Sequence, residues 1–284
     1  MNAGFPIRLG ISTCPNDTFA FHALMTHAVD WRGLDFHIEL LDIQQLNERL
    51  FAGDLDIGKA SFHAALLLAA KWVVLPSGSA LGFGVGPLLL AARPRTTPEH
   101  GEQQLTLCPG KLTTATLLFK LFYPQRSRVE QTVFSEIMPR LSQATADFGV
   151  CIHEGRFTWQ EAGLTLVEDL GSRWEQDTHS PLPLGGILAR RSLPKDVLAR
   201  AQAVIRDSID AALSDPQAAL PTMRQHAQEF NDEVLMQHVE LYVNQWTCDL
   251  GQTGETSLAE LARRAQQAGI LSDQAKLEIF AAVE

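Results

Sequence analysis

Residues 146–157, which read ADFGVCIHEGRF, contain the transition on which the predicted fold depends. The run 148–152 is short, apolar and of the strand type, and it stops abruptly at His153-Glu154-Gly155. In open α/β sheets, ligands bind in the crevice at the carboxyl ends of the strands. A histidine there can change its charge near neutral pH, which suits proton transfer. A lone histidine at a strand end more often only forms a hydrogen bond, so the rest of the chain has to decide between the two interpretations.

Outward from this segment, strand-like runs alternate with helical patterns. The runs lie at 7–12, 34–42, 55–59, 72–76, 88–92 and 104–108, and helical patterns follow several of them, as at 43–51, 62–70 and 114–122. Everything from Pro194 onward reads as helix, including a last short helix at 273–283. This alternation predicts an α/β fold.

Two segments rich in glycine and proline, 78–87 and 178–189, read as crossings between two lobes. We therefore predict a two-lobed α/β fold of the type II periplasmic-binding-protein kind, with two interlobe crossings and a helical C-terminal part. Residues 1–90 and 187–284 would form a discontinuous first lobe, and residues 91–186 the second. A ligand cleft would lie between the lobes.

The charge balance argues against a polyanionic partner. The 284 residues carry 23 Lys and Arg against 33 Asp and Glu, a formal net charge of -10. Nucleic-acid binding requires a basic face, so we expect no nucleic-acid partner. A small anionic substrate remains compatible with this charge, because local dipoles can bind anions on an acidic protein.

The cysteines and the apolar runs indicate a cytoplasmic protein. The four cysteines are scattered and form no CxxC pair, which is typical neither of a disulfide framework nor of a zinc site. No secretory signal is visible at the N-terminus, and the longest apolar stretch, 64–75, contains Lys71 and is too short to span a bilayer. We expect a reducing, cytoplasmic setting and no membrane association.

Three junctions at which a strand-like run leads into a helical pattern carry hydroxyl groups. They are 12–18, Lys59-Ala60-Ser61 and Thr113-Thr114. Free backbone N–H groups and the helix dipole at such places favour anions. Each junction alone could be simple helix capping. Because all three follow strands and His153 follows a fourth, we predict a carboxylate ligand held by Ser61, Thr113 and Thr114.

Other polar residues point less clearly to a site. Glu154 is read as a solvated acid, Asp17 as a cap or turn residue, and Lys59 as a partner either of the substrate or of a surface salt bridge. The histidines other than His153 show no HExxH or similar spacing, so no metal site is predicted.

An ordered set of motifs carries a resemblance to a known family. They are 12–19 (STCPNDTF), 59–61 (KAS), 82–87 (GFGVGP), 109–114 (PGKLTT), 152–157 (IHEGRF), 181–185 (PLPLG), 226–229 (HAQE) and 241–244 (LYVN). Together they resemble the 1,4-dihydroxy-6-naphthoate synthases of the futalosine route to menaquinone. The resemblance covers nearly the whole chain.

The resemblance implies a cytoplasmic carbon–carbon lyase. Its substrate would be cyclic dehypoxanthine futalosine, an aromatic carboxylate with a sugar-derived part, and its product 1,4-dihydroxy-6-naphthoate. By motif, His153 would be the proton acceptor, and Lys59, Ala60, Ser61, Thr113 and Thr114 would bind the substrate. No cofactor and no metal would be required, and the oligomeric state is left open.

Two other functions remain open. One is chorismate dehydratase, a sister enzyme of similar fold in the same pathway; the CPNDTF and IHE segments favour the synthase. The other is a non-catalytic solute-binding protein for an organic anion, against which we weigh His153 at the predicted cleft and the lack of a visible signal peptide.

Overall fold

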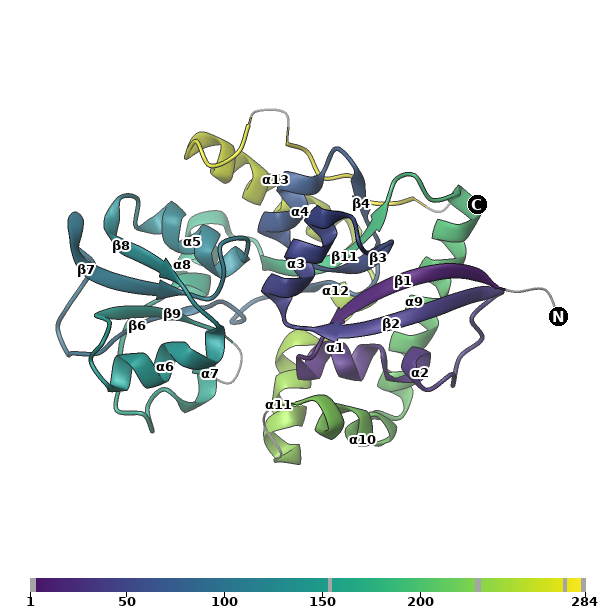
Figure 1. The fold of residues 1–284 in the computed structure, drawn as a ribbon, viewed down its shortest axis with the longest axis horizontal. Coiled ribbons are helices and arrows are strands. Elements are labelled where there is room, and N and C mark those ends of the chain that lie inside the picture. Colours follow the sequence, from purple (N-terminus) through teal and green to yellow (C-terminus); the bar gives the residue numbers. More distant parts are fainter. Residues whose placement is uncertain (1–3, 153–154, 228–230, 273–274, 282–284) are drawn as a thin grey trace.

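The computed structural model describes residues 4–152, 155–227, 231–272 and 275–281. These residues form two mixed β-sheets with covering helices (Figure 1). The strands are β1 (Phe5–Ser12), β2 (Leu34–Leu41), β3 (Ile57–Ser61), β4 (Trp72–Val74), β5 (Ala80–Gly82), β6 (Leu88–Ala91), β7 (Gly101–Cys108), β8 (Arg126–Gln131), β9 (Phe148–Cys151), β10 (Thr165–Asp169) and β11 (Leu182–Arg190). The helices are α1 (Pro15–Ala20), α2 (His22–Met25), α3 (Ile43–Ala52), α4 (Phe62–Leu68), α5 (Thr114–Phe122), α6 (Phe134–Ser142), α7 (Gly155–Thr158), α8 (Leu170–Thr178), α9 (Lys195–Ser214), α10 (Pro216–His226), α11 (Asp232–Tyr242), α12 (Gln245–Cys248) and α13 (Gly251–Gln267). Within the described ranges, no helix is long and apolar enough to cross a membrane.

The first sheet has the strand order β2-β1-β3-β11-β4, and β5 pairs with β11 at its far end. Strand β1 runs parallel to β2 and β3, whereas β11 runs antiparallel to β3, β4 and β5. Because β1 and β3 are parallel neighbours, their last residues, Ser12 and Ser61, lie at the same edge of the sheet. This edge faces the site described below.

Helices cover both faces of the first sheet. On one face, the alternating side chains Ile7, Leu9 and Ile11 of β1 pack with Val204 and Ile205 of α9. On the other face, α3, α4 and α13 contribute to a separate apolar cluster. The second half of β1, from Leu9 to Ser12, is therefore buried on both sides, whereas Arg8 is exposed.

Local sequence signals set the ends of α3. Asp42 accepts hydrogen bonds from the backbone N–H groups of Gln44 and Gln45, and the Gln45 side chain accepts one from the N–H of Asp42, which is a capping box. At the other end Gly53 adopts φ 78°, a left-handed conformation that glycine tolerates without strain. The predicted helix at 43–51 is confirmed.

The second sheet has the strand order β10-β6-β9-β7-β8. Strand β7 runs parallel to both β8 and β9, so β7 and β9 end at the same edge. The chain after β7 leads to Thr113, and the residue after β9 is Ile152. Helix α6 covers one face through Ile137 and Leu141, and α5 and α8 cover the other.

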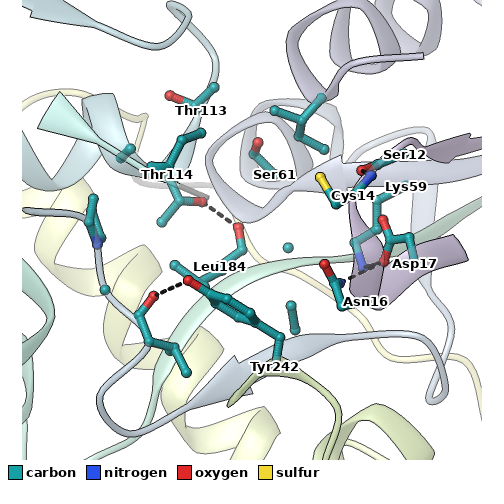
Figure 2. A pocket seen from close by; sticks show the side chains of 18 of the residues that line it. Ser12, Cys14, Asn16, Asp17, Lys59, Ser61, Thr113, Thr114, Leu184 and Tyr242 are labelled. Atoms are coloured by element: carbon teal, nitrogen blue, oxygen red, sulfur yellow. Dashed lines mark hydrogen bonds and ion pairs between the residues drawn. The ribbon is translucent and has the colours of Figure 1, made fainter. Parts of the chain in front are cut away.

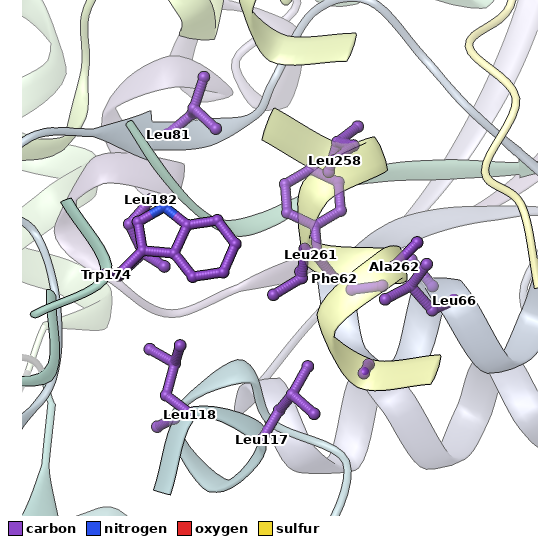
Figure 3. Packing of buried hydrophobic residues seen from close by; sticks show 14 of the residues in the cluster. Phe62, Leu66, Leu81, Leu117, Leu118, Trp174, Leu182, Leu258, Leu261 and Ala262 are labelled. Carbon is purple, nitrogen blue, oxygen red and sulfur yellow. The ribbon is translucent and has the colours of Figure 1, made fainter. Parts of the chain in front are cut away.

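One apolar cluster joins the two sheets. Figure 3 shows Trp174 of α8 and Leu118 of α5 beside Leu182 of β11, with Phe62 of α4 and Leu258 of α13 completing the packing. These five side chains are at most 2% exposed. The two sheets are thus joined through a shared apolar core.

The strands divide between the sheets near the predicted crossings. The chain leaves the first sheet after β5 and enters the second at β6, and it returns at β11 after α8. The predicted lobe limits, 1–90 with 187–284 and 91–186, stay a prediction. At both crossings the chain passes from one sheet to the other slightly before the predicted limit. Leu88 already pairs in the second sheet, and Leu182 already pairs in the first.

The helix predicted at 273–283 is wrong for the described part of that segment. Residues 275–281 are not helical; Ile279 forms a parallel bridge with Val74, and the N–H of Phe280 donates to the carbonyl of Val74 at 2.7 Å. The pairing covers the free edge of β4, which explains why an extended chain is preferred there.

Candidate active site

A pocket lies where the strand ends of the two sheets meet (Figure 2). Its volume is about 710 Å³, counted out to its open mouth. The apolar lining comes from Ile43, Ala80, Val85, Pro87, Ala115, Ile152 and Leu184, and the polar lining includes Ser12, Asn16, Asp17, Lys59, Ser61, Thr113, Thr114, His238 and Tyr242. A pocket with apolar walls and a few polar groups suits a small organic ligand.

Ser61 ends β3 and precedes α4, but its hydroxyl does not cap that helix. The buried side chain of Asn47 holds it instead: Asn47 Nδ2 donates to Ser61 Oγ at 3.2 Å, and Asn47 Oδ1 accepts from the Ser61 N–H at 3.0 Å. Because Ser61 Oγ acts as an acceptor in this pair, its own proton remains available to a ligand.

Thr113 precedes α5 and is a true N-cap. Its Oγ1 accepts from the N–H of Thr116 at 3.2 Å and donates to the carbonyl of Gly110 at 2.8 Å. The hydroxyl is therefore engaged within the protein, although Thr113 does line the pocket.

Thr114 connects three segments around the pocket. Its hydroxyl donates to the carbonyl of Leu184 in β11 at 2.6 Å and accepts from the N–H of His63 in α4 at 3.4 Å. Within the described chain, the backbone N–H groups of Thr114 and Ala115 have no hydrogen-bond partner. These two donors lie in the first turn of α5, whose dipole favours a negative charge at this end.

His63 joins the starts of α4 and α5 beneath the pocket. Its Nδ1 lies 3.2 Å from the carbonyl oxygen of Thr113, so Nδ1 carries the proton and donates it. Burial lowers the pKa of His63 to about 4, and the positive charge of Lys120 acts in the same direction. His63 is thus neutral at physiological pH.

Lys59 is neither at the surface nor unpaired. Its Nζ donates to Asp17 Oδ1 at 2.6 Å and to the carbonyl of Gly78 at 2.9 Å, and both charged side chains are at least nine-tenths buried. The prediction of a surface salt bridge for Lys59 is therefore wrong. Asp17, read from sequence as a cap or turn residue, lines the pocket as the partner of this cation.

Ala60 has a different place from its neighbours. Its side chain is fully buried in the apolar cluster that joins the sheets, and Ala60 is absent from the described lining of the pocket. The other predicted binding residues, Lys59, Ser61, Thr113 and Thr114, all line it.

The structure adds residues that sequence reasoning did not assign to the site. Asn16 Nδ2 donates to Asp17 Oδ1 at 3.0 Å, and Asn16 Oδ1 lies 3.3 Å from Nε2 of His238 in α11. His238 packs against Tyr242, with ring centroids 4.5 Å apart. The CPNDTF and LYVN motifs were the signals that could have indicated Asn16 and Tyr242, because both motifs contribute residues to the pocket wall.

The predicted general base, His153, and its neighbour Glu154 lie outside the described residues. The segment on either side of them is described. Ile152, directly after β9, lines the pocket. After the gap, Arg156 of α7 donates to the carbonyl of Gly86 at 2.5 Å and to Asp169 at 2.7 Å, which ties this segment to the first crossing.

Gly86 is required by the close approach of the chain at this crossing. A Cβ atom on Gly86 would lie 2.2 Å from the Cα of Gly171, closer than real contacts allow. Val85, Gly86 and Pro87 line the pocket, so the packing of Gly86 on Gly171 fixes one of its walls.

Comparison with known proteins identifies relatives over nearly the whole chain. The model of a family described as menaquinone biosynthesis matches residues 7–267. A protein of Thermus thermophilus named 1,4-dihydroxy-6-naphthoate synthase is 40% identical over 264 residues, covering 93% of this chain and 95% of that protein. A protein of the same name from Streptomyces coelicolor is 38% identical over 271 residues, covering 93% and 94%.

Solved structures share the architecture. A protein from Archaeoglobus fulgidus superposes with a TM-score of 0.86 at 29% identity, covering 94% of this chain and 98% of that one. The alkanesulfonate-binding protein of Xanthomonas axonopodis pv. citri, solved with bound MOPS, superposes with a TM-score of 0.72 at 12% identity, covering 99% of each chain, and shows the fold alone. The predicted periplasmic-binding-protein-like fold class is confirmed.

Proposed function

The chain belongs to the menaquinone biosynthesis family, and from this premise we propose that it is a 1,4-dihydroxy-6-naphthoate synthase. It is a carbon–carbon lyase that converts cyclic dehypoxanthine futalosine to 1,4-dihydroxy-6-naphthoate with release of the sugar-derived fragment. The observation that supports this assignment is the separation of two polar groups in the wall of one pocket (Figure 2). Thr113 and Thr114 at the start of α5 lie on one side, and Asn16, Asp17 and Lys59 lie on the other.

The anion-binding end fits the aromatic carboxylate of this substrate. Ser61 offers a hydroxyl proton, and the first-turn N–H groups of Thr114 and Ala115 offer two further donors at a positive helix end. Ile43, Val85 and Ile152 are among the apolar side chains that would pack on the aromatic ring. The pose supported by these features places the carboxylate between α4 and α5.

We assign the proton-acceptor role to His153 on its sequence position. It follows Ile152, a pocket residue, and a neutral imidazole has a basicity suited to removing a proton from the cyclic sugar-derived part near neutral pH. Breaking the carbon–carbon bond then leads to an aromatic ring, whose stability drives the reaction forward. The protons and electron pairs move within the substrate and the base, so the reaction as proposed requires no external oxidant.

The cytoplasm is the compartment we propose for this reaction. None of the four cysteines forms a disulfide in the described structure, and burial raises the pKa of Cys108 and Cys151 to about 12, so both remain thiols. Such unpaired, buried cysteines are typical of a reducing compartment.

Incubation with cyclic dehypoxanthine futalosine, followed by mass spectrometry, tests the function. We expect 1,4-dihydroxy-6-naphthoate to form with wild-type protein and to be nearly absent with His153→Ala, while that variant still binds the substrate. Chorismate in a parallel reaction tests the alternative dehydratase. Turnover of chorismate alone would identify that enzyme, and binding without turnover of either compound would identify a solute-binding protein. Near wild-type turnover by His153→Ala would contradict the role of His153.

A further inference from the structure

We infer that Asp17, held by Lys59 and Asn16, is a specificity-determining residue that recognises neighbouring hydroxyl groups on the sugar-derived part of the substrate. The inference rests on the proposed function and extends it to the end of the pocket that the carboxylate does not occupy. Figure 2 shows the two ends: Thr113 and Thr114 lie on one side of the pocket, and Asp17, Asn16 and Lys59 on the other.

The two carboxylate oxygens of Asp17 differ: Oδ1 is bonded within the protein, whereas Oδ2 is available to a ligand. Oδ1 accepts hydrogen bonds from Lys59 Nζ at 2.6 Å and from Asn16 Nδ2 at 3.0 Å. Oδ2 has no hydrogen-bond partner among the residues described, although the residue is only 3% exposed and lines the pocket. A carboxylate oxygen without a partner on a residue that lines a pocket is a strong hydrogen-bond acceptor, and a hydroxyl group is the uncharged donor that matches it.

The charges at this end favour a neutral polyol over a second anion. Lys59 and Asp17 neutralise each other at 2.6 Å, so the pair offers little net attraction to a carboxylate. The ammonium has a third N–H in addition to those that bond Asp17 and Gly78. A carboxylate acceptor beside an ammonium donor can bind two adjacent hydroxyl groups, one through each.

The hydrogen-bond pattern also fixes the orientation of Asp17. The carboxylate only accepts, so the Asn16 amide must turn its Nδ2 toward Asp17 and its Oδ1 toward His238. The Nε2 atom of His238 must then carry a proton. Segments from β3, α1 and α11 thereby hold the Asp17 side chain in place before the substrate arrives, which reduces the ordering cost of binding.

A purely structural role is the alternative. A buried ion pair between α1 and β3 could serve only to hold the two elements together, and its removal would then disturb all ligands equally. Substrate and product distinguish a recognition role of Asp17 from a structural one. The substrate carries the sugar-derived part, whereas the product 1,4-dihydroxy-6-naphthoate keeps the carboxylate but lacks that part.

The test compares steady-state turnover of cyclic dehypoxanthine futalosine with the dissociation constant of 1,4-dihydroxy-6-naphthoate, measured by calorimetry. For Asp17→Asn we expect kcat/KM for the substrate to fall about ten- to hundredfold, with the product affinity changed less than about twofold. The matched control is Ser61→Ala at the anion end, which should weaken substrate and product by similar factors. Thermal unfolding of each variant verifies that it is folded.

If Asp17→Asn does not fold because Lys59 is left unpaired, the double variant Asp17→Asn/Lys59→Met, which removes both buried charges, takes its place with the same expected selectivity. Equal losses for substrate and product, or no loss for either, would overturn the role of Asp17 while wild-type turnover leaves the proposed function intact. A wild-type protein that does not convert the substrate would overturn the proposed function and this inference with it.

Discussion

Helices α4 and α5 start with the same sequence signal, a hydroxyl residue directly after a strand or loop, yet the two hydroxyls have different roles. Thr113 caps α5 through the N–H of Thr116. Ser61 has the extended backbone of an N-cap but makes no capping bond, because Asn47 holds its side chain and its N–H. The two starts lie close together, joined by His63 and Thr114.

The difference shows that a hydroxyl residue before a helical pattern predicts where the helix starts, but not whether the hydroxyl caps it. What decides the role is a partner elsewhere in the chain: Asn47, 14 residues before Ser61, diverts its hydroxyl from the helix, while the partners of Thr113 lie within three residues of it. Four measurements test whether the two helix starts differ in this way.

The largest expected effect concerns His63, which joins the two starts. Its pKa is about 4 in the folded protein and about 6.5 when unfolded, so between these values the unfolded chain binds a proton that the folded protein does not. The free energy of unfolding should therefore fall as the pH is lowered from 6.5, by about 3 kcal/mol at pH 4 from this group alone.

Urea unfolding of wild-type protein and His63→Asn at pH 7 and at pH 4 measures this contribution. The asparagine amide can still donate to the carbonyl of Thr113 but does not titrate, so the variant should lose less stability over the same pH range. Parallel pH profiles for the two proteins would show that His63 is not kept neutral by its burial.

Asn47→Ala should come next. The variant leaves the N–H of Ser61 without its acceptor in a fully buried place, which should lower the free energy of unfolding by about 2 kcal/mol. It should also weaken binding of 1,4-dihydroxy-6-naphthoate, because the Ser61 hydroxyl loses the bond that orients it. If the variant is as stable as wild type, the Ser61 N–H does not depend on Asn47 for its hydrogen bond.

Thr113→Ala tests the cap of α5. Loss of the bond to the Thr116 N–H should lower the free energy of unfolding by about 1 kcal/mol, and Thr113→Ser should restore most of it. Chemical denaturation of the three proteins measures the difference. If serine restores nothing, the methyl group rather than the hydroxyl of Thr113 is what stabilises this start.

Ser61→Ala removes no capping bond but leaves the buried Nδ2 of Asn47 without its acceptor, so it should lower the free energy of unfolding by no more than about 1 kcal/mol. Its effect on the affinity for 1,4-dihydroxy-6-naphthoate should exceed that of Thr113→Ala, and it should amount to about fivefold for one hydrogen bond. The opposite ranking of the two variants in a binding titration would reverse the roles given to the two hydroxyls.

Much of the fold could be predicted because its signals are local. The capping box at Asp42, the glycine at Gly53 and the alternating apolar residues of β1 each act within a few residues. Helix α8 was missed because only Leu170, Gly171 and Trp174 of its nine residues are buried, too few for a clear apolar stripe. The extended chain at 275–281 depends on the free edge of β4, about two hundred residues away in the sequence, which no local pattern reports.

The residues of the site also fall into two groups, those predictable from local sequence and those that depend on distant contacts. Ser61, Thr113 and Thr114 could be found because hydroxyls at helix starts are visible in a short window. Asp17 and Lys59 are 42 residues apart, and Asn16 and His238 are 222 residues apart, so only the folded chain reveals that they are in contact. Their residue types are ordinary, and their importance comes from the partner that each one meets.

The position of β11 has a consequence for how the protein is made. This strand lies between β3 and β4 in the first sheet, yet it follows the whole second sheet in the sequence. A nascent chain that has emerged only as far as α8 has β3 and β4 with exposed hydrogen-bonding edges and cannot complete its first lobe. The rate of folding should therefore depend on the late insertion of β11, and chains released before Leu182 should aggregate rather than fold.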